Sequence, residues 1–247
     1  MKLERFFQDN QRVALGFSGG VDSSYLLYAG IQCGADIRPY YIKTAFQPQF
    51  EMDDAMRLAQ QLGVGVTVID LYILSLPVVV TNPADRCYHC KSALFGALQS
   101  RALADGYSVL IDGTNASDDA DDRPGMRALR ELSVRSPLQE CGLTKERVRQ
   151  LSKDAGLFTW DKPAYACLAT RIPTGEAYTA EVLTCVEKAE DVLFRFGFSD
   201  FRIRVFHGAA RLQLPAQQMN KAIELADEIK KRVEPFFPVI LLDLEGR

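Results

Sequence analysis

The segment LGFSGGVDSSYLL (residues 15–27) decides how the first half of the chain folds. An apolar run, RVALGF (residues 12–17), leads into a glycine-rich turn, and apolar residues then recur at helical spacing. Two glycines let the backbone approach an anion closely, and the N–H groups at a helix N-terminus point at such a ligand. The order strand, loop, helix therefore predicts a phosphate-binding loop.

This loop lacks the lysine of a Walker A loop and carries Asp22 instead. A carboxylate does not bind phosphate directly at neutral pH, but it can hold a Mg²⁺ ion that bridges phosphate oxygens. The hydroxyls of Ser18, Ser23 and Ser24 add donors. The alternative is an ordinary glycine turn with a serine cap. The position, composition and order of the segment favour the phosphate site.

Strands alternate with helices over the first 112 residues. We predict strands at 36–44, 64–71 and 107–112 and helices at 51–62 and about 91–103. This alternation is typical of an α/β fold, a parallel sheet with helices on both faces. Ligands of such sheets bind beyond the carboxyl ends of the strands, so segments 18–23, 43–46 and 112–115 should converge on one pocket.

The pattern changes in the second half. The acidic segment 116–126 is expected to be a mobile loop, and Thr144 caps the next helix. Beyond Pro173 follows a small α/β unit with helices at 181–196 and about 216–232 and strands at 201–206, 210–214 and 238–244. We therefore expect a first domain at 1–172 and a small domain at 173–247 that binds substrate or supports oligomerisation.

Composition narrows the class of protein. The chain has 247 residues and a net charge of −3, so a broad basic face for nucleic acid is not indicated. No apolar run approaches the roughly 20 residues that span a bilayer, and residues 1–17 lack signal-peptide features. We predict a cytoplasmic protein, in which the six cysteines are not a disulfide framework.

The string SGGVDS after an apolar strand resembles the PP-loop of the ATP pyrophosphatase superfamily, which includes GMP synthetase, NAD synthetase and the tRNA thiolation enzymes. In that superfamily the loop holds the pyrophosphate end of ATP, which leaves when the α-phosphorus is attacked, so no P-loop lysine is needed. The resemblance implies ATP and Mg²⁺ as ligands, and it extends to DGTN at residues 112–115 and to an adenine position near Thr44. The candidate ATP contacts are Phe17, Ser18, Gly19, Gly20, Asp22, Ser23, Thr44, Gly113 and Thr114, with Lys91 as a further candidate for a phosphate.

Two cysteine contexts stand out. Cys87 and Cys90 have Cys-x-x-Cys spacing, which is compatible with a redox pair, half of a zinc site, two ligands of an iron–sulfur cluster, or two buried cysteines. Cys167 lies in a proline-containing loop near Lys162 and Arg171, cations that lower a thiol pKa. It is either a nucleophile or an inert buried cysteine.

Five segments in this order resemble the LarE family over nearly the whole chain: SGGVDSS, DRCYHCKSALF, DGTNASDD with RPGMRAL, PAYACLATRIPTGE and FRIRVFHGAARLQLP. That family consists of ATP-dependent sulfurtransferases that make the nickel-pincer nucleotide cofactor of lactate racemase. The resemblance implies adenylation of a carboxylate of pyridinium-3,5-biscarboxylic acid mononucleotide, release of pyrophosphate, and conversion to a thiocarboxylate. It also implies a homo-oligomer.

The sulfur source follows one of two patterns in the family. Members with three cysteines bind a 4Fe–4S cluster that carries an extra sulfide, and Cys87, Cys90 and Cys167 match that pattern. Members with one site cysteine sacrifice it and are left with dehydroalanine, and Cys167 matches that position. The presence of all three cysteines favours the cluster.

Arginines complete the expected site. Arg202 and Arg204 alternate on a predicted strand and share one face, either as a solvated edge or, by the resemblance, as a grip on the substrate phosphate. Arg171 is expected to join them or to contact a carboxylate. Two other functions remain open: a tRNA thiolase with the same loop, and a non-catalytic nucleotide- or metal-binding regulator.

Overall fold

The computed structural model describes residues 2–118 and 124–246. Contacts between residues divide the chain into two compact units. The N-terminal unit comprises residues 1–44, 49–73 and 85–162, and the C-terminal unit comprises 45–48, 74–84 and 163–247. The expected domain boundary at residue 172 stays a prediction, while the contacts assign residues 163–172 to the C-terminal unit.

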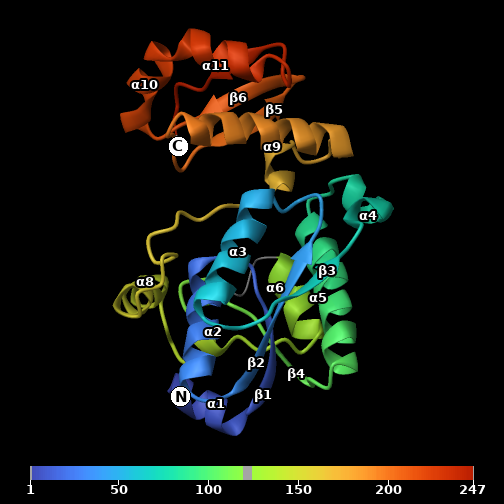
Figure 1. Ribbon diagram of the computed structural model, residues 1–247. Coiled ribbons are helices and arrows are strands. Elements are labelled where there is room, and N and C mark those ends of the chain that lie inside the picture. The colour runs from blue at the N-terminus through green and yellow to red at the C-terminus, as the bar shows by residue number, and fades with distance from the viewer. Residues whose placement is uncertain (1, 119–123, 247) are drawn as a thin grey trace. The chain divides into compact units, whose positions relative to one another are not determined.

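The N-terminal unit is built on a four-stranded parallel sheet in the order β3-β2-β1-β4. Its strands are β1 (Arg12–Gly16), β2 (Asp36–Lys43), β3 (Thr67–Asp70) and β4 (Val109–Ile111). Its α-helices are α1 (Leu3–Asp9), α2 (Val21–Gln32), α3 (Gln49–Gln61), α5 (Arg86–Ala104), α6 (Pro124–Glu131), α7 (Pro137–Glu140) and α8 (Lys145–Asp154). Figure 1 shows the strands between α2 and α5, so the α/β fold with a parallel sheet is confirmed.

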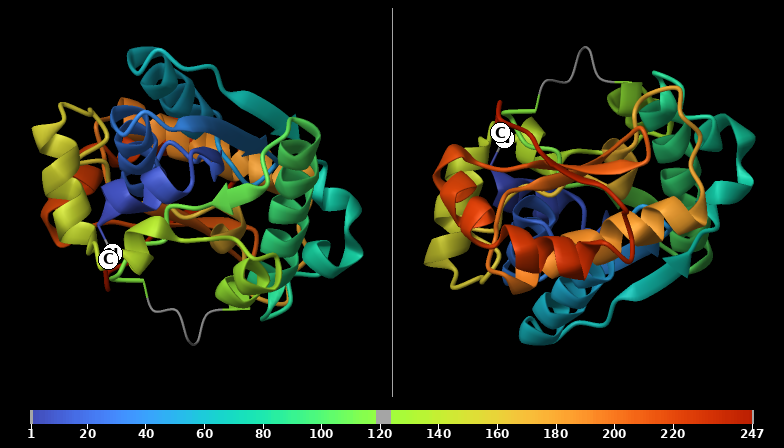
Figure 2. Two further views of the ribbon diagram at one scale, coloured as in Figure 1. Left: turned by 90° about the horizontal axis from the view of Figure 1, so that it is seen from below. Right: turned by 90° about the horizontal axis from the view of Figure 1, so that it is seen from above.

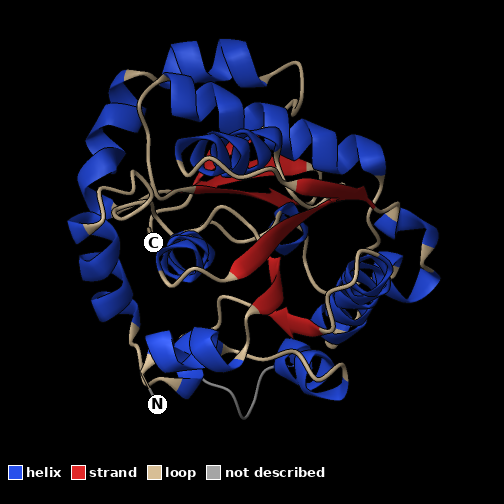
Figure 3. Ribbon diagram, turned by 60° about the horizontal axis from the view of Figure 1, so that its bottom comes forward, coloured by secondary structure: helices blue, strands red, loops and turns tan. Residues whose placement is uncertain are grey.

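Alternation along the strands explains the layers. Val13 and Leu15 of β1 pack on one face with residues of α1, α2, α3 and α8. Ala14, one residue out of phase, packs on the opposite face with Leu98 of α5. Figure 3 shows helices on both faces of this sheet, as the buried faces require.

Strand order positions the site. The chain runs from β1 outward to β2 and β3, and then returns to place β4 on the other side of β1. The loops that leave β1 and β4 therefore diverge from neighbouring strand ends. Such a switch point is where open α/β sheets bind ligands.

The C-terminal unit holds a three-stranded sheet in the order β5-β6-β7, with β5 antiparallel and β7 parallel to β6. Its elements are α4 (Pro77–Val80), α9 (Ala180–Arg195), β5 (Arg202–Phe206), β6 (Ala209–Gln213), α10 (Met219–Glu224), α11 (Ala226–Val233) and β7 (Ile240–Leu242). Figure 2 shows α9 and α11 side by side against these strands. The helix expected at 216–232 is interrupted at Leu225.

Candidate functional site

A cavity of about 560 Å³ lies in the N-terminal unit where the loops after β1 and β4 meet. It is lined by loop residues Ser18, Gly20, Asp22 and Ser23, by Asp112, Gly113 and Thr114, and by Cys87, Lys91 and Phe95 of α5, among others. Two of the three segments expected to converge do so. Thr44, buried after β2, is not part of this lining, and its adenine contact stays a prediction.

The loop after β1 has little freedom to change shape. Gly19 has φ +71°, and a Cβ atom there would lie 2.8 Å from the Cβ of Ala55 on α3. The N–H of Ser18 donates to Oγ of Ser23 over 3.3 Å, and this hydroxyl donates to the carbonyl of Gly20, also over 3.3 Å. The loop is therefore shaped before any ligand arrives.

The turn after β4 is fixed in the same way. Asp112 is buried and accepts hydrogen bonds from Oγ1 of Thr114 (2.6 Å) and Oγ of Ser136 (2.7 Å). Gly113 packs so closely that a Cβ atom would lie 2.9 Å from the backbone nitrogen of Ser23. The two loops thus form one wall of the cavity, and only glycine fits at their contact.

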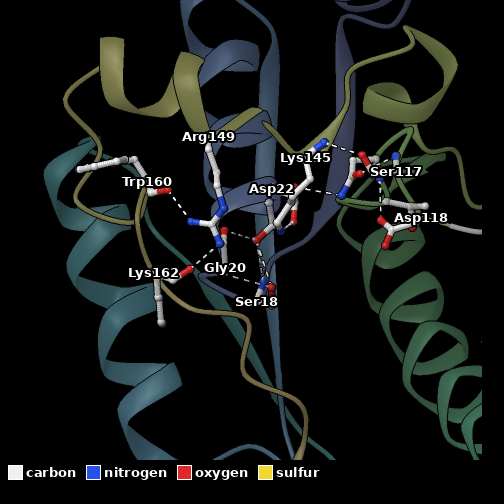
Figure 4. Close-up of polar contacts among 12 residues, drawn as sticks. Ser18, Gly20, Asp22, Ser117, Asp118, Lys145, Arg149, Trp160 and Lys162 are labelled. Carbon is white, nitrogen blue, oxygen red and sulfur yellow. Dashed lines mark hydrogen bonds and ion pairs between the residues drawn. The ribbon is translucent and has the colours of Figure 1, made fainter. Parts of the chain in front are cut away.

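Asp22 carries the negative charge of the cavity. It accepts a hydrogen bond from Nδ2 of Asn115 over 3.2 Å and forms an ion pair with the ammonium of Lys145, the first residue of α8. Burial raises the pKa of Asp22, Lys145 acts to lower this pKa, and Asp118 raises it further. Figure 4 shows Lys145 directed at Asp22 beside Ser18 and Gly20. Mg²⁺ prefers oxygen ligands such as carboxylates, so Asp22 is the residue of this cavity that would hold the ion, which would replace Lys145 as its cation.

Helix α5 brings a thiol and an ammonium group to the same cavity. Cys87 is exposed and its Sγ accepts a hydrogen bond from Nη2 of Arg86 over 3.1 Å. The stem of Lys91 packs on Gly125, where a Cβ atom would lie 2.9 Å from Cδ of the lysine. Lys91 therefore approaches α6 closely while lining the cavity, which suits a cation that binds phosphate.

Cys167 belongs to the C-terminal unit and directly precedes the short 3₁₀ helix Leu168–Arg171. The side chain of Arg171 is fully buried and pairs with Glu190 of α9 at 2.8 Å. Burial acts to lower the pKa of Arg171, but the hydrogen bond and charge of Glu190 outweigh it and raise this pKa. Lys162, expected near the thiol, forms its ion pair with Asp54 of α3 at 2.7 Å.

Arg202 and Arg204 hold the segment that contains Cys167. Nη2 of Arg202 donates to the carbonyl of Ala164 over 3.0 Å, and Nη1 of Arg204 donates to the carbonyl of Thr170 over 2.8 Å. Both arginines thus place positive charge around the cysteine. Their contact with a substrate phosphate stays a prediction.

Three residues of these networks were not expected from the sequence: Asn115 as a side-chain contact of Asp22, Lys145 and Glu190. One signal was available for Lys145, since a lysine is unfavourable as the first residue of a helix. Among residues 2–118 and 124–246 no three His, Cys, Asp or Glu side chains form a group that could hold a metal ion. Most of the acidic run 118–122, including Asp119, lies outside the described residues.

Comparisons with known proteins give three informative relatives, while no family model matches. An uncharacterized protein of Synechocystis is 38% identical over 99% of this chain and 92% of its own length. The pyridinium-3,5-bisthiocarboxylic acid mononucleotide synthase of Lactiplantibacillus plantarum is 32% identical over 97% of this chain and 88% of its own length. A tRNA-specific 2-thiouridylase of Thermotoga petrophila is 24% identical over 59% of this chain and 52% of its own length.

Proposed function

The chain belongs to the LarE family, within the PP-loop superfamily, and on that premise we propose that it is an ATP-dependent sulfurtransferase. The proposed substrate is pyridinium-3,5-biscarboxylic acid mononucleotide, and the product is a thiocarboxylate for the nickel-pincer cofactor of lactate racemase. Support for sulfur insertion comes from the L. plantarum relative, a pyridinium-3,5-bisthiocarboxylic acid mononucleotide synthase that aligns over nearly the whole chain.

One observation carries the proposal. A single cavity is lined by the loop residues Ser18, Gly20 and Asp22 and by Cys87 and Lys91 of α5. A thiol beside a phosphate-binding loop is what sulfur transfer to an adenylated substrate requires, and a simple nucleotide-binding protein has no need of it.

Adenylation is the first proposed step. A carboxylate oxygen of the substrate attacks the α-phosphorus of ATP, and pyrophosphate leaves with its electron pair. Asp22 would hold a Mg²⁺ ion, which together with the loop would stabilise the charge on the leaving group. The ammonium of Lys145, which pairs with Asp22 in this structure, and that of Lys91, which lines the same cavity, would then contact the phosphates.

In the second step sulfur attacks the acyl carbon of the adenylated substrate. The bond from this carbon to the bridging oxygen breaks, and AMP leaves with that oxygen. In the sacrificial alternative the thiolate of Cys167 forms a thioester with the substrate. Loss of a proton from its Cα and cleavage of its Cβ–S bond then release the thiocarboxylate and leave dehydroalanine.

A cluster on Cys87, Cys90 and Cys167 is the version we favour. Cys87 and Cys90 are three residues apart at the start of α5, on one side of the helix and in no disulfide, and so fit a thiolate donor pair. A cluster held by these three thiolates would carry the extra sulfide and supply it for transfer to the substrate. The positions of Arg202 and Arg204 beside the Cys167 segment support a role in holding the anionic substrate. The buried Arg171 is paired with Glu190 and donates to the carbonyls of Ala166 and Cys167, so its contact with the substrate stays a prediction.

We also propose a cytoplasmic homo-oligomer. No helix within the described part of the chain is long and apolar enough to cross a bilayer. An apolar groove of the C-terminal unit supports the proposed self-association.

The test is pyrophosphate release with purified protein, Mg·ATP and the mononucleotide, followed by mass analysis of the product. We expect pyrophosphate, AMP and a thiocarboxylate, all dependent on the mononucleotide. ATP binding without pyrophosphate release would instead identify a nucleotide-binding regulator. Release stimulated by tRNA and not by the mononucleotide would identify a thiolase of RNA, whose complex would weaken steeply with salt.

A further inference from the structure

Glu190 is a buried carboxylate that the proposed function does not use. Its side chain is 1% exposed, and it interrupts the apolar stripe of α9 formed by Leu183, Val186 and Leu193. Carboxylates are almost never fully buried unless they are paired, because removing an ionised group from water is costly. A charge at this position therefore requires a structural or functional reason.

The hydrogen bonds of Glu190 connect three segments of the C-terminal unit. Arg171 donates to it through Nε (2.8 Å) and Nη2 (3.0 Å), the two-pronged geometry of a strong guanidinium–carboxylate pair. The hydroxyl of Tyr165 and the N–H of Ile203 (3.0 Å) also donate to it. Four donors satisfy the carboxylate and hold β5 and the Cys167 segment against α9.

The remaining nitrogen of Arg171 acts on the backbone next to Cys167. Nη1 donates to the carbonyl of Ala166 over 2.7 Å, to the carbonyl of Cys167 over 3.3 Å and to Oγ1 of Thr170 over 2.8 Å. The guanidinium plane is thus fixed at one edge by Glu190 and fixes the backbone of Cys167 at the other. Tyr165 covers this plane, with its ring centroid 4.5 Å from Cζ of Arg171.

We propose that Glu190 is a positioning residue for sulfur transfer, which acts on Cys167 through Arg171. This inference rests on the proposed function. It goes further because it assigns Glu190 to the second step alone. The residues that line the cavity at the loops after β1 and β4 belong to the N-terminal unit, whereas the four donors to Glu190 all lie in the C-terminal unit.

The sharpest variant is Glu190→Gln, which keeps the shape of the side chain and removes its charge. One oxygen becomes an NH₂ group that faces a guanidinium donor, so Arg171 loses half of its support and turns. A displacement of about 1 Å at a reacting group costs on the order of 100-fold in rate. We therefore expect about a 100-fold loss of thiocarboxylate formation with single-turnover pyrophosphate release unchanged.

Asp191→Asn is the matched control, because it makes the same charge change on the neighbouring residue of α9. Burial and the charges of Glu187 and Glu190 raise the pKa of Asp191, while Arg195 acts to lower it, and none of these groups belongs to the Cys167 segment. Both half-reactions should proceed in this variant at the wild-type rate. Thermal melting of all variants reports whether α9 remains packed.

Two results would overturn the role of Glu190: loss of both half-reactions together in Glu190→Gln, or loss of neither.

If Glu190→Gln does not fold, Tyr165→Phe removes one hydrogen bond from the same carboxylate and keeps the ring over Arg171. We expect this variant to lose roughly 5- to 10-fold in sulfur transfer alone, as one hydrogen bond of about 1 kcal/mol predicts. A folded Tyr165→Phe with wild-type sulfur transfer contradicts the inference. Failure of the proposed function is read separately, from wild-type protein that releases no pyrophosphate.

Discussion

At the scale of single residues, the ion pair between Asp22 and Lys145 explains how an acidic group is tolerated in the proposed phosphate site. Burial raises the pKa of Asp22, and the ammonium of Lys145 opposes that effect. In the absence of nucleotide the lysine neutralises the carboxylate. In the proposed complex, Mg²⁺ would lie at the carboxylate of Asp22 and the phosphates at the ammonium of Lys145, so that each side chain would face a ligand of opposite charge.

The first prediction concerns Lys145→Met, which keeps the apolar stem and removes the charge. One charge-assisted hydrogen bond to a phosphate is worth about 2 kcal/mol, so pyrophosphate release should slow roughly 30-fold. Lys153→Met is the control, since this lysine lies on the same helix with its Nζ 4.6 Å from the ring centroid of Trp160. Equal rates of pyrophosphate release in the two variants would show that Lys145 does not contact a phosphate during the reaction.

The second prediction concerns Gly113→Ala. Its Cβ would lie 2.9 Å from the nitrogen of Ser23 and 3.3 Å from Cβ of Asp22, so the two loops must separate. We expect at least a tenfold loss of ATP affinity by calorimetry and a lower free energy of unfolding, by about 1–3 kcal/mol, as overpacking predicts.

Gly96→Ala provides the contrast for Gly113. It lies inside α5 with no atom within 4 Å of an added Cβ, so alanine should stabilise the helix by about 0.5–1 kcal/mol and leave ATP affinity unchanged. If Gly113→Ala behaves like Gly96→Ala, the close contact between the two loops does not shape the nucleotide site.

At the scale of elements, local patterns predicted what depends on neighbours in sequence. The strand, loop and helix around SGGVDS were foreseen, because alternation, glycine and capping are local signals. Helix α5 was expected to begin at Lys91 but begins at Arg86, so both cysteines lie in its first turns. The contacts of Lys145 and Glu190 were not predicted, because their partners are distant in sequence. Asp22, for example, precedes Lys145 by 123 positions.

The start of α5 leads to the third prediction. With Cys87→Ala, anaerobically purified protein should lose its iron and the visible absorption of a cluster, and activity should stop at one turnover or fewer, because two thiolates hold a cluster poorly. Cys33→Ala, on a residue at the end of α2, is the control. Full multiple-turnover activity of Cys87→Ala would contradict the cluster. In a separate measurement on the wild-type protein after turnover, loss of one H₂S equivalent from Cys167 by intact mass would indicate sacrifice.

At the scale of the whole molecule, the proposed steps are divided between the two units. The N-terminal unit supplies the loops and cations for ATP, while the C-terminal unit holds Cys167 and the arginines around it. The C-terminal unit also has a groove of about 500 Å³ along β7, α10 and α11. Ile223 and Leu241 line it and are 63% and 38% exposed. An apolar edge strand beside such a groove is a site for pairing with another chain.

A second copy of this chain is the occupant that the charges favour. Asp227 and Lys230 both line the groove and lie three residues apart on the short helix α11, with the aspartate nearer its N-terminus. Around a two-fold axis, antiparallel copies of α11 place each aspartate opposite the partner's lysine, so the surface is complementary to itself. The β7 edges can pair in the same arrangement and bury the apolar side chains.

The last prediction follows from that self-complementarity. Leu241→Lys puts a charge in the centre of the expected contact, where its desolvation is not compensated. Light scattering after gel filtration should give an oligomer for the wild type and a single chain for the variant. Leu103→Lys changes an equally apolar residue of α5 that is 55% exposed, and it should leave the assembly intact. A wild-type protein that is a single chain at all concentrations, or a Leu241→Lys variant that still assembles, would show that this groove does not join copies of the chain.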